Sequence, residues 1–172
     1  MIPGLISLGG KVKILSKTGE RFLPLEDFFA GAGRSNLRPG EILTEIQVPN
    51  LPTLTGSRYA KHTIRKAMDL AFVGVAVTLS SGQSPNQCKE VRIALGAVGP
   101  VPLRATEAEI FLRGRKVDDD SISRAALLAS EQAKPITDVR ASGEYRKEMV
   151  RVLTYRAIKQ VWDSLGRGGI SP

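Results

Sequence analysis

The sequence contains one cysteine and one histidine, and each scarcity excludes a class of site. Cys88 has no second cysteine to pair with, so the 172-residue chain can form no internal disulfide, and a reducing compartment, the cytoplasm, is expected. His62 alone cannot supply a Cys/His structural zinc site. A Ser-His-Asp or Cys-His catalytic site would have to use His62, and this lone histidine lacks the partners that such a role requires.

Aromatic residues and long apolar runs are also scarce. No apolar run approaches the roughly 20 residues that a membrane-spanning helix needs, so we expect no membrane span. The N-terminal MIPGLISLGG lacks the basic segment and the cleavage site of a signal peptide, and reads better as the end of a helix that Gly9-Gly10 terminates.

The net charge of +8 invites a nucleic-acid interpretation. Aromatic residues make up only 5% of the chain, its basic residues are scattered, and no nucleic-acid motif occurs, so we expect no nucleic-acid partner. A basic face toward an acidic protein or an anionic cofactor explains the charge equally well.

Strand signals fill the first two thirds of the sequence, and helix signals fill the last third. A hairpin (11–15 and 21–23), a helical turn (24–29) and four further strands (42–48, 58–64, 71–79 and 90–98) are expected. Helices are expected over 106–112, with Thr106 as N-cap, over 118–134 and over 144–165. This order predicts an α+β fold rather than alternating α/β.

Two glycine- or polar-rich segments read as loops rather than as sites. Gly31-Ala32-Gly33 neither follows a strand nor opens an apolar helix, which favours a flexible connection over a phosphate loop. Cys88 is expected in a polar surface loop as a free thiol. A domain boundary is expected near 49–56.

Five strings carry a family resemblance. They are GERFLPLEDFFAG (19–31), LRPGEILTEIQVP (37–49), RYAKHTIRKAMDLAFVGVAVTL (58–79), VRIALGAVGPVPLRATEAE (91–109) and EYRKEMVRVLTYRAI (144–158). In this order they resemble the FAD-binding medium subunit of the molybdenum hydroxylases, the family of aerobic carbon monoxide dehydrogenase and of the xanthine dehydrogenase flavoprotein. The two glycine-rich segments that hold the FAD pyrophosphate in that family have no counterpart here, so the resemblance implies the C-terminal part of such a subunit.

The resemblance also implies a domain organisation. Residues 1–55 are expected to be the end of a second FAD-binding α+β subdomain. Residues 56–166 are expected to be the C-terminal domain, a small antiparallel sheet packed with three helices, and residues 167–172 a flexible tail.

Three positions match family residues at the flavin, and each has a simpler alternative. Lys61 matches a lysine close to the flavin, where a cation would stabilise the reduced ring; otherwise it is a strand lysine in a surface ion pair. Leu43 matches an apolar residue beside the flavin or adenine, and can equally be strand core. Asp69 ends a loop over one flavin face, or else a solvated charged turn. No catalytic or metal-binding residue is expected on this chain.

The implied function is electron relay. Flavin would pass electrons from a [2Fe-2S] subunit to NAD, quinone or oxygen, while a molybdopterin subunit oxidises the substrate within a hetero-oligomer. One alternative is a non-catalytic assembly module that binds no flavin alone. The other, less favoured, is a basic nucleic-acid-binding domain, which salt-dependent DNA retention would support.

Overall fold

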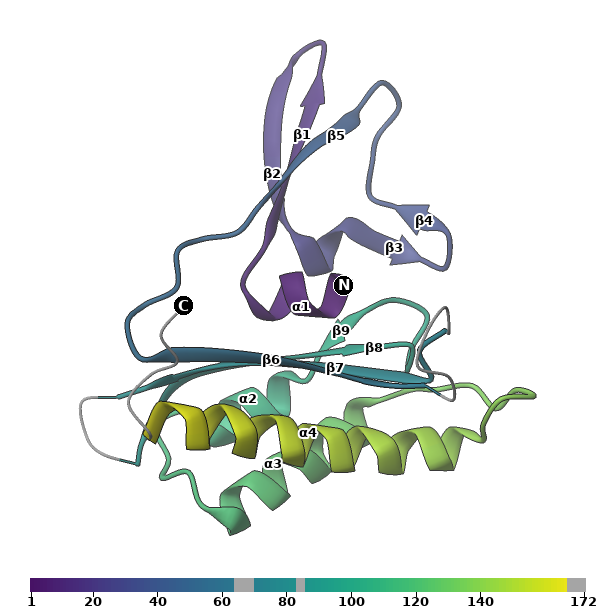
Figure 1. Cartoon of the computed structure of the whole chain (residues 1–172). Helices are drawn as coiled ribbons and strands as arrows, with labels where there is room; N and C mark the ends of the chain where they lie inside the picture. Colours follow the sequence, from purple (N-terminus) through teal and green to yellow (C-terminus); the bar gives the residue numbers. More distant parts are fainter. Residues whose placement is uncertain (64–69, 83–85, 167–172) are drawn as a thin grey trace.

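The computed structural model describes residues 1–63, 70–82 and 86–166, so Asp69 and the tail expected at 167–172 lie outside the described residues. Figure 1 shows three layers: an N-terminal unit rests on one face of a central sheet, and three helices cover the other face. The expected α+β class is therefore confirmed.

The central sheet is antiparallel and has the strand order β6-β7-β8-β9. Its strands are β6 (Thr55–His62), β7 (Val73–Ser81), β8 (Cys88–Gly96) and β9 (Leu103–Arg104). Lys61 lies opposite Gly74, and Val77 lies opposite Ile93.

Side-chain size alternates along the two central strands and gives the sheet two different faces. The branched residues Val75, Val77 and Ile93 belong to the main core on the helical side. Ala76 and Ala94 point to the other face, because successive side chains of a strand alternate, and they join a second core under the N-terminal unit.

The helical layer consists of α2 (Thr106–Leu112), α3 (Asp119–Gln132) and α4 (Gly143–Gly166). Helix α3 begins with a capping box, in which the Asp118 carboxylate accepts the Ser121 backbone N–H while the Ser121 hydroxyl accepts that of Asp118. Helix α4 crosses β6 and β7, and a Cβ at Gly56 would lie 2.9 Å from a Val161 methyl. Glycine therefore allows α4 to approach this edge strand closely.

The N-terminal unit contains α1 (Ile2–Ser7), β1 (Lys11–Ser16), β2 (Gly19–Pro24), the 3₁₀ turn η1 (Leu25–Phe28), β3 (Phe29–Gly31), β4 (Arg34–Ser35) and β5 (Ile42–Gln47). Strands β2-β1-β5 form a three-stranded sheet. Helix α1 packs on β7 and β8, where a Cβ at Gly96 would lie 2.6 Å from the Pro3 ring. The small residues of the sheet therefore provide the space that α1 occupies.

Four details of the sequence interpretation require correction or refinement. Cys88 is fully buried as the first residue of β8, so its predicted place in a polar surface loop is wrong. Ala105, not Thr106, is the N-cap of α2. The strand predicted over 58–64 begins earlier, at Thr55, and ends at His62. Gly31, predicted in a flexible connection, is the last residue of β3 and pairs with Arg34 of β4 in a short hairpin.

Among the residues described, no helix is both long and apolar enough to cross a membrane, and no group of three or more metal-ligating side chains converges on one point.

Candidate functional site

Lys61 and Leu43, which are far apart in the sequence, lie on the same side of the central sheet. Along β6, Gly56 and Ala60 face the helical core, since Gly56 meets α4 and Ala60 packs against the main cluster. Side chains alternate along a strand, so Lys61 points to the opposite face, where α1 packs. Its side chain is exposed there.

Leu43 lies on that side of the central sheet, in the N-terminal unit. It pairs with Ile14 in the β1–β5 ladder and packs against a buried cluster that includes Ala76 of β7. Ala76 is two residues from Gly74, the residue opposite Lys61. A half-buried apolar side chain of the N-terminal unit and an exposed cation of β6 therefore lie on the same side of the central sheet.

Tyr59 lies on the same face as Lys61 and was not singled out from the sequence. Its hydroxyl lies over β7, 2.8 Å from where a Cβ would stand at Gly74, and burial raises the pKa of the phenol. The phenol is therefore neutral at physiological pH. The signal was present in the strand alternation, which puts residues 59 and 61 on one side once Ala60 is assigned to the core.

His62 and Phe72, which flank residues 63–71, contact each other through their backbones and their rings. The Phe72 backbone N–H donates to the His62 carbonyl at 2.9 Å, and the two rings meet edge to face. His62 Nε2 also lies 3.1 Å from the Tyr145 hydroxyl at the start of α4. Asp69 lies outside the described residues, so its predicted role is left as a prediction.

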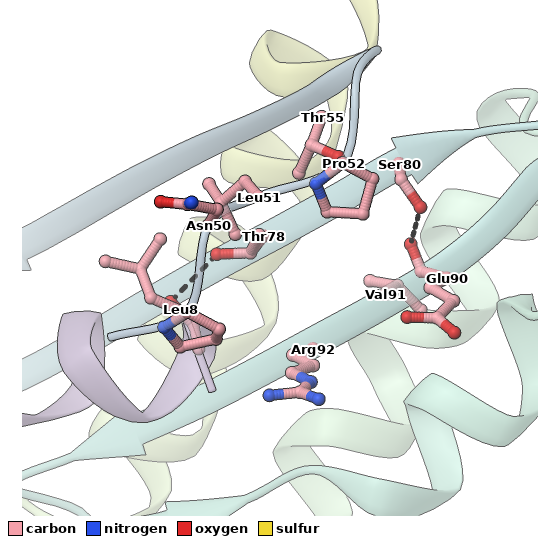
Figure 2. A pocket seen from close by; sticks show the side chains of 12 residues that line it. Leu8, Asn50, Leu51, Pro52, Thr55, Thr78, Ser80, Glu90, Val91 and Arg92 are labelled. Carbon is pink, nitrogen blue, oxygen red and sulfur yellow. Dashed lines mark hydrogen bonds between the residues drawn. The ribbon is translucent and has the colours of Figure 1, made fainter. Parts of the chain in front are cut away.

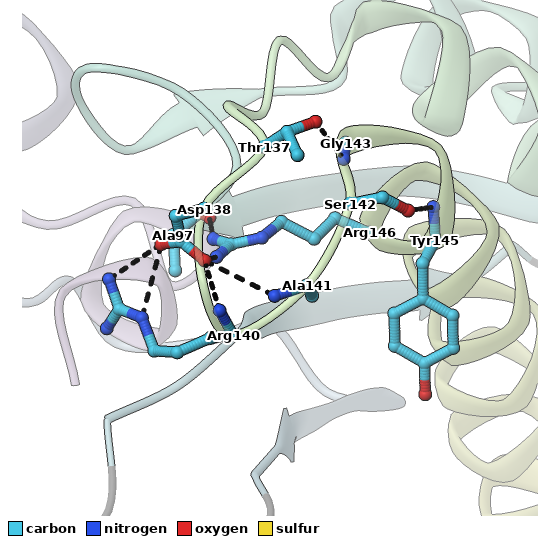
Figure 3. Close-up of polar contacts among 9 residues, drawn as sticks. All are labelled: Ala97, Thr137, Asp138, Arg140, Ala141, Ser142, Gly143, Tyr145 and Arg146. Carbon is cyan, nitrogen blue, oxygen red and sulfur yellow. Dashed lines mark hydrogen bonds and ion pairs between the residues drawn. The ribbon is translucent and has the colours of Figure 1, made fainter.

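Arg146, the neighbour of Tyr145, is buried at the centre of a polar network (Figure 3). Its guanidinium donates to the Asp138 carboxylate at 2.7 Å and to the Ala97 carbonyl at 3.3 Å. Hydrogen bonds from the Arg140 backbone N–H, the Arg140 side chain and Arg146 hold the pKa of Asp138 well below its usual range. The network ties α4 to the end of β8.

A separate cavity lies at the opposite end of β6 (Figure 2). Thr55, which lines it, is the first residue of the strand, whereas Lys61 is the seventh. At about 3.3 Å per residue, six steps place the two roughly 20 Å apart. This cavity is therefore distinct from the face bordered by Leu43 and Lys61.

Comparison with known families assigns both parts of the chain. Residues 58–161 match the family described as "CO dehydrogenase flavoprotein C-terminal domain". Residues 1–51 match the family described as "FAD binding domain in molybdopterin dehydrogenase". The chain thus contains part of an FAD-binding domain.

Individual proteins support the same assignment. The chain is 34% identical over 158 residues to the glyceraldehyde dehydrogenase medium chain of Sulfolobus acidocaldarius, which covers 91% of this chain and 54% of that protein. It is 34% identical over 160 residues to the carbon monoxide dehydrogenase medium chain of Afipia carboxidovorans, with coverage of 92% and 54%. The chain therefore spans about half the length of the curated relatives it matches.

Solved structures agree in fold. The reconstituted CO dehydrogenase from Oligotropha carboxidovorans superposes with a TM-score of 0.87 at 32% identity, covering 95% of this chain and 56% of the other. Quinoline 2-oxidoreductase from Pseudomonas putida 86 superposes with a TM-score of 0.83 at 31% identity, covering 96% and 56%. From sequence and fold together, this chain belongs to the FAD-binding flavoprotein subunits of the molybdenum hydroxylase family.

Proposed function

We propose that this chain forms the C-terminal part of an electron-relaying flavoprotein subunit and that Leu43 and Lys61 border its flavin. The observation that carries the proposal is their common position on the α1 side of the central sheet, one on each structural unit. Residues 1–55 would supply the end of the FAD-binding subdomain, and residues 56–166 the domain that closes the site from the other side.

Each residue would have a distinct task. A bound flavin supplies reversible electron transfer. The Lys61 ammonium would stabilise the negative charge of the reduced ring and so raise its reduction potential. Leu43 would provide an apolar wall that excludes water, with the neutral phenol of Tyr59 beside Lys61 on the sheet. Asp69 remains a proposed flavin contact.

The remaining redox groups would belong to partner chains. The names "medium chain" and "medium subunit" among the relatives indicate complexes of several chains. We propose that a [2Fe-2S] subunit delivers electrons to the flavin, that a molybdopterin subunit oxidises the substrate, and that NAD, quinone or oxygen accepts the electrons. The free thiol of Cys88 is consistent with a cytoplasmic complex.

The test compares Lys61→Gln with Lys89→Gln, which removes another exposed strand lysine, on β8. Flavin affinity is measured by the quenching of FAD fluorescence. The reduction potential of the bound flavin is measured by reducing it together with a reference redox dye. Loss of about 1–2 kcal/mol of charge stabilisation lowers a two-electron potential by about 20–45 mV, and only Lys61→Gln should show this shift. Equal potentials and equal affinities in both variants would refute the role of Lys61.

A further inference from the structure

The cavity at the start of β6 has the features of a binding site. It occupies about 220 Å³ between the end of α1, the 49–52 connection and the sheet strands β6, β7 and β8. Figure 2 shows Thr55, Thr78 and Ser80 along one side and Glu90 and Arg92 along the other. The volume would hold about seven waters at about 30 Å³ each, or one small organic molecule.

Hydroxyl groups in this cavity have unused hydrogen-bonding capacity. The Thr55 hydroxyl is buried and has no hydrogen-bond partner among the described residues. Within the described part of the chain, the Ser80 hydroxyl makes a single long contact, 3.5 Å to the Glu90 carbonyl, although the residue is buried. A buried hydroxyl without a partner costs about 1–3 kcal/mol, so a ligand that bonds to these groups would recover that energy.

The other hydroxyl groups near the cavity are joined to one another by hydrogen bonds. Thr78 Oγ1 donates to Ser7 Oγ at 3.1 Å, and Ser7 Oγ donates to the Gly4 carbonyl at 2.8 Å. The Ser57 hydroxyl lies 3.0 Å from Thr78 Oγ1. These contacts fix α1 to the sheet and leave the cavity preformed between them.

Arg92 supplies a cation that forms no ion pair among the described residues. Its side chain is half-buried, yet it makes no ion pair or side-chain hydrogen bond with any residue that the structure describes. The guanidinium lies across Gly9, where a Cβ would stand 1.9 Å from Arg92 Nη1, so the positive-φ glycine makes room for it. A half-buried cation without an anion is costly, and a bound carboxylate would relieve this cost.

Glu90 restricts the chemistry of that anion. Its carboxylate lines the same cavity on the same side as Arg92, so it would repel a simple inorganic anion bound there. A group that donates a hydrogen bond beside the carboxylate would satisfy Glu90. The apolar side chains of Leu8, Leu51 and Pro52 can cover a short carbon skeleton.

We propose that this cavity binds a small organic carboxylate that carries a neighbouring hydroxyl or amino group. The carboxylate would pair with Arg92, and the Thr55 and Ser80 hydroxyls would complete its hydrogen bonds. The neighbouring donor group would face Glu90. The site is independent of the flavin face and of the function proposed above.

Protein-observed NMR and calorimetry on this chain test the proposal, with glycerate and serine as probes and sulfate and glycerol as controls. Backbone amide shifts should locate glycerate and serine at Thr55, Ser80 and Arg92. Arg92→Gln should weaken both probes at least tenfold, because a charged hydrogen bond is lost. Arg124→Gln, which removes an exposed arginine on α3, should leave binding unchanged.

Two further variants sharpen the assignment. Thr55→Val keeps the shape of the side chain and should weaken both probes several-fold. Glu90→Gln should weaken serine more than glycerate, since only serine presents an ammonium group. The proposal fails if amide shifts in the wild-type chain lie elsewhere or are absent, if sulfate binds as tightly as glycerate, or if Arg92→Gln binds like the wild type.

Discussion

Glu109 is the buried acid whose replacement should damage the fold most clearly. It lies on α2 with 2% of its surface exposed. Its carboxylate accepts the Ile93 backbone N–H at 2.8 Å and bonds to two nitrogens of the Arg104 guanidinium. Arg104 in turn donates to Glu26 of η1 at 3.1 Å. One carboxylate therefore joins α2, β8 and β9 and, through Arg104, the N-terminal unit.

Glu109→Gln keeps the volume and one acceptor oxygen but removes the charge. Breaking a buried ion pair costs about 3–5 kcal/mol, and the lower end applies because Arg104 retains Glu26. A loss of about 3 kcal/mol in the free energy of unfolding corresponds to about 6–12 °C in Tm for a chain of this size.

Urea titration followed by circular dichroism measures this loss. Glu107→Gln on the same helix is the control, because that side chain is exposed and its replacement should cost less than about 0.5 kcal/mol. The Glu109→Gln/Arg104→Gln double variant should cost less than the sum of the two single variants, since both remove one interaction. The reasoning is wrong if Glu109→Gln lies within about 1 kcal/mol of the wild type.

Three further predictions concern the packing, the pH response and the thiol. Gly96→Ala should lower the free energy of unfolding by about 1–3 kcal/mol in a urea titration, because the new methyl group meets the Pro3 ring. An unchanged unfolding midpoint would show that α1 can shift freely. The side-chain hydrogen bonds of Arg21, the largest cause, lower the pKa of Glu41 to about 2, so the stability from this pair is present above pH 4.5 and is lost as the pH falls toward 2. The melting temperatures of wild type and Glu41→Gln should accordingly converge in acid, and a constant difference would contradict this. Burial raises the pKa of the Cys88 thiol to about 12, so a disulfide reagent at mild alkaline pH should label it in urea but not in the native protein.

The sequence predicted the sheet better than it predicted the loops. The Val-Gly-Val-Ala-Val run of β7 alternates large and small residues, and both faces follow from that pattern. Cys88 was misplaced because its burial depends on hydrogen bonds with Gly114 and Arg115, which are distant in the sequence.

The candidate site residues also differ in whether the sequence could reveal them. Lys61 and Leu43 were found through family resemblance, and their roles stay predictions. Tyr59 could have been added by strand alternation. The Arg92 cavity could not be found from the sequence, because α1, the 49–52 connection and three strands must first be brought together in space.

Photolabelling with an azido derivative of FAD, mapped by mass spectrometry, tests the central claim most directly. The account predicts that peptides from β5 and β6, containing Leu43 or Lys61, carry the label, and that unmodified FAD competes it away. Label confined to other peptides, or no labelling above that of the urea-unfolded chain, would contradict the claim that this chain borders a flavin.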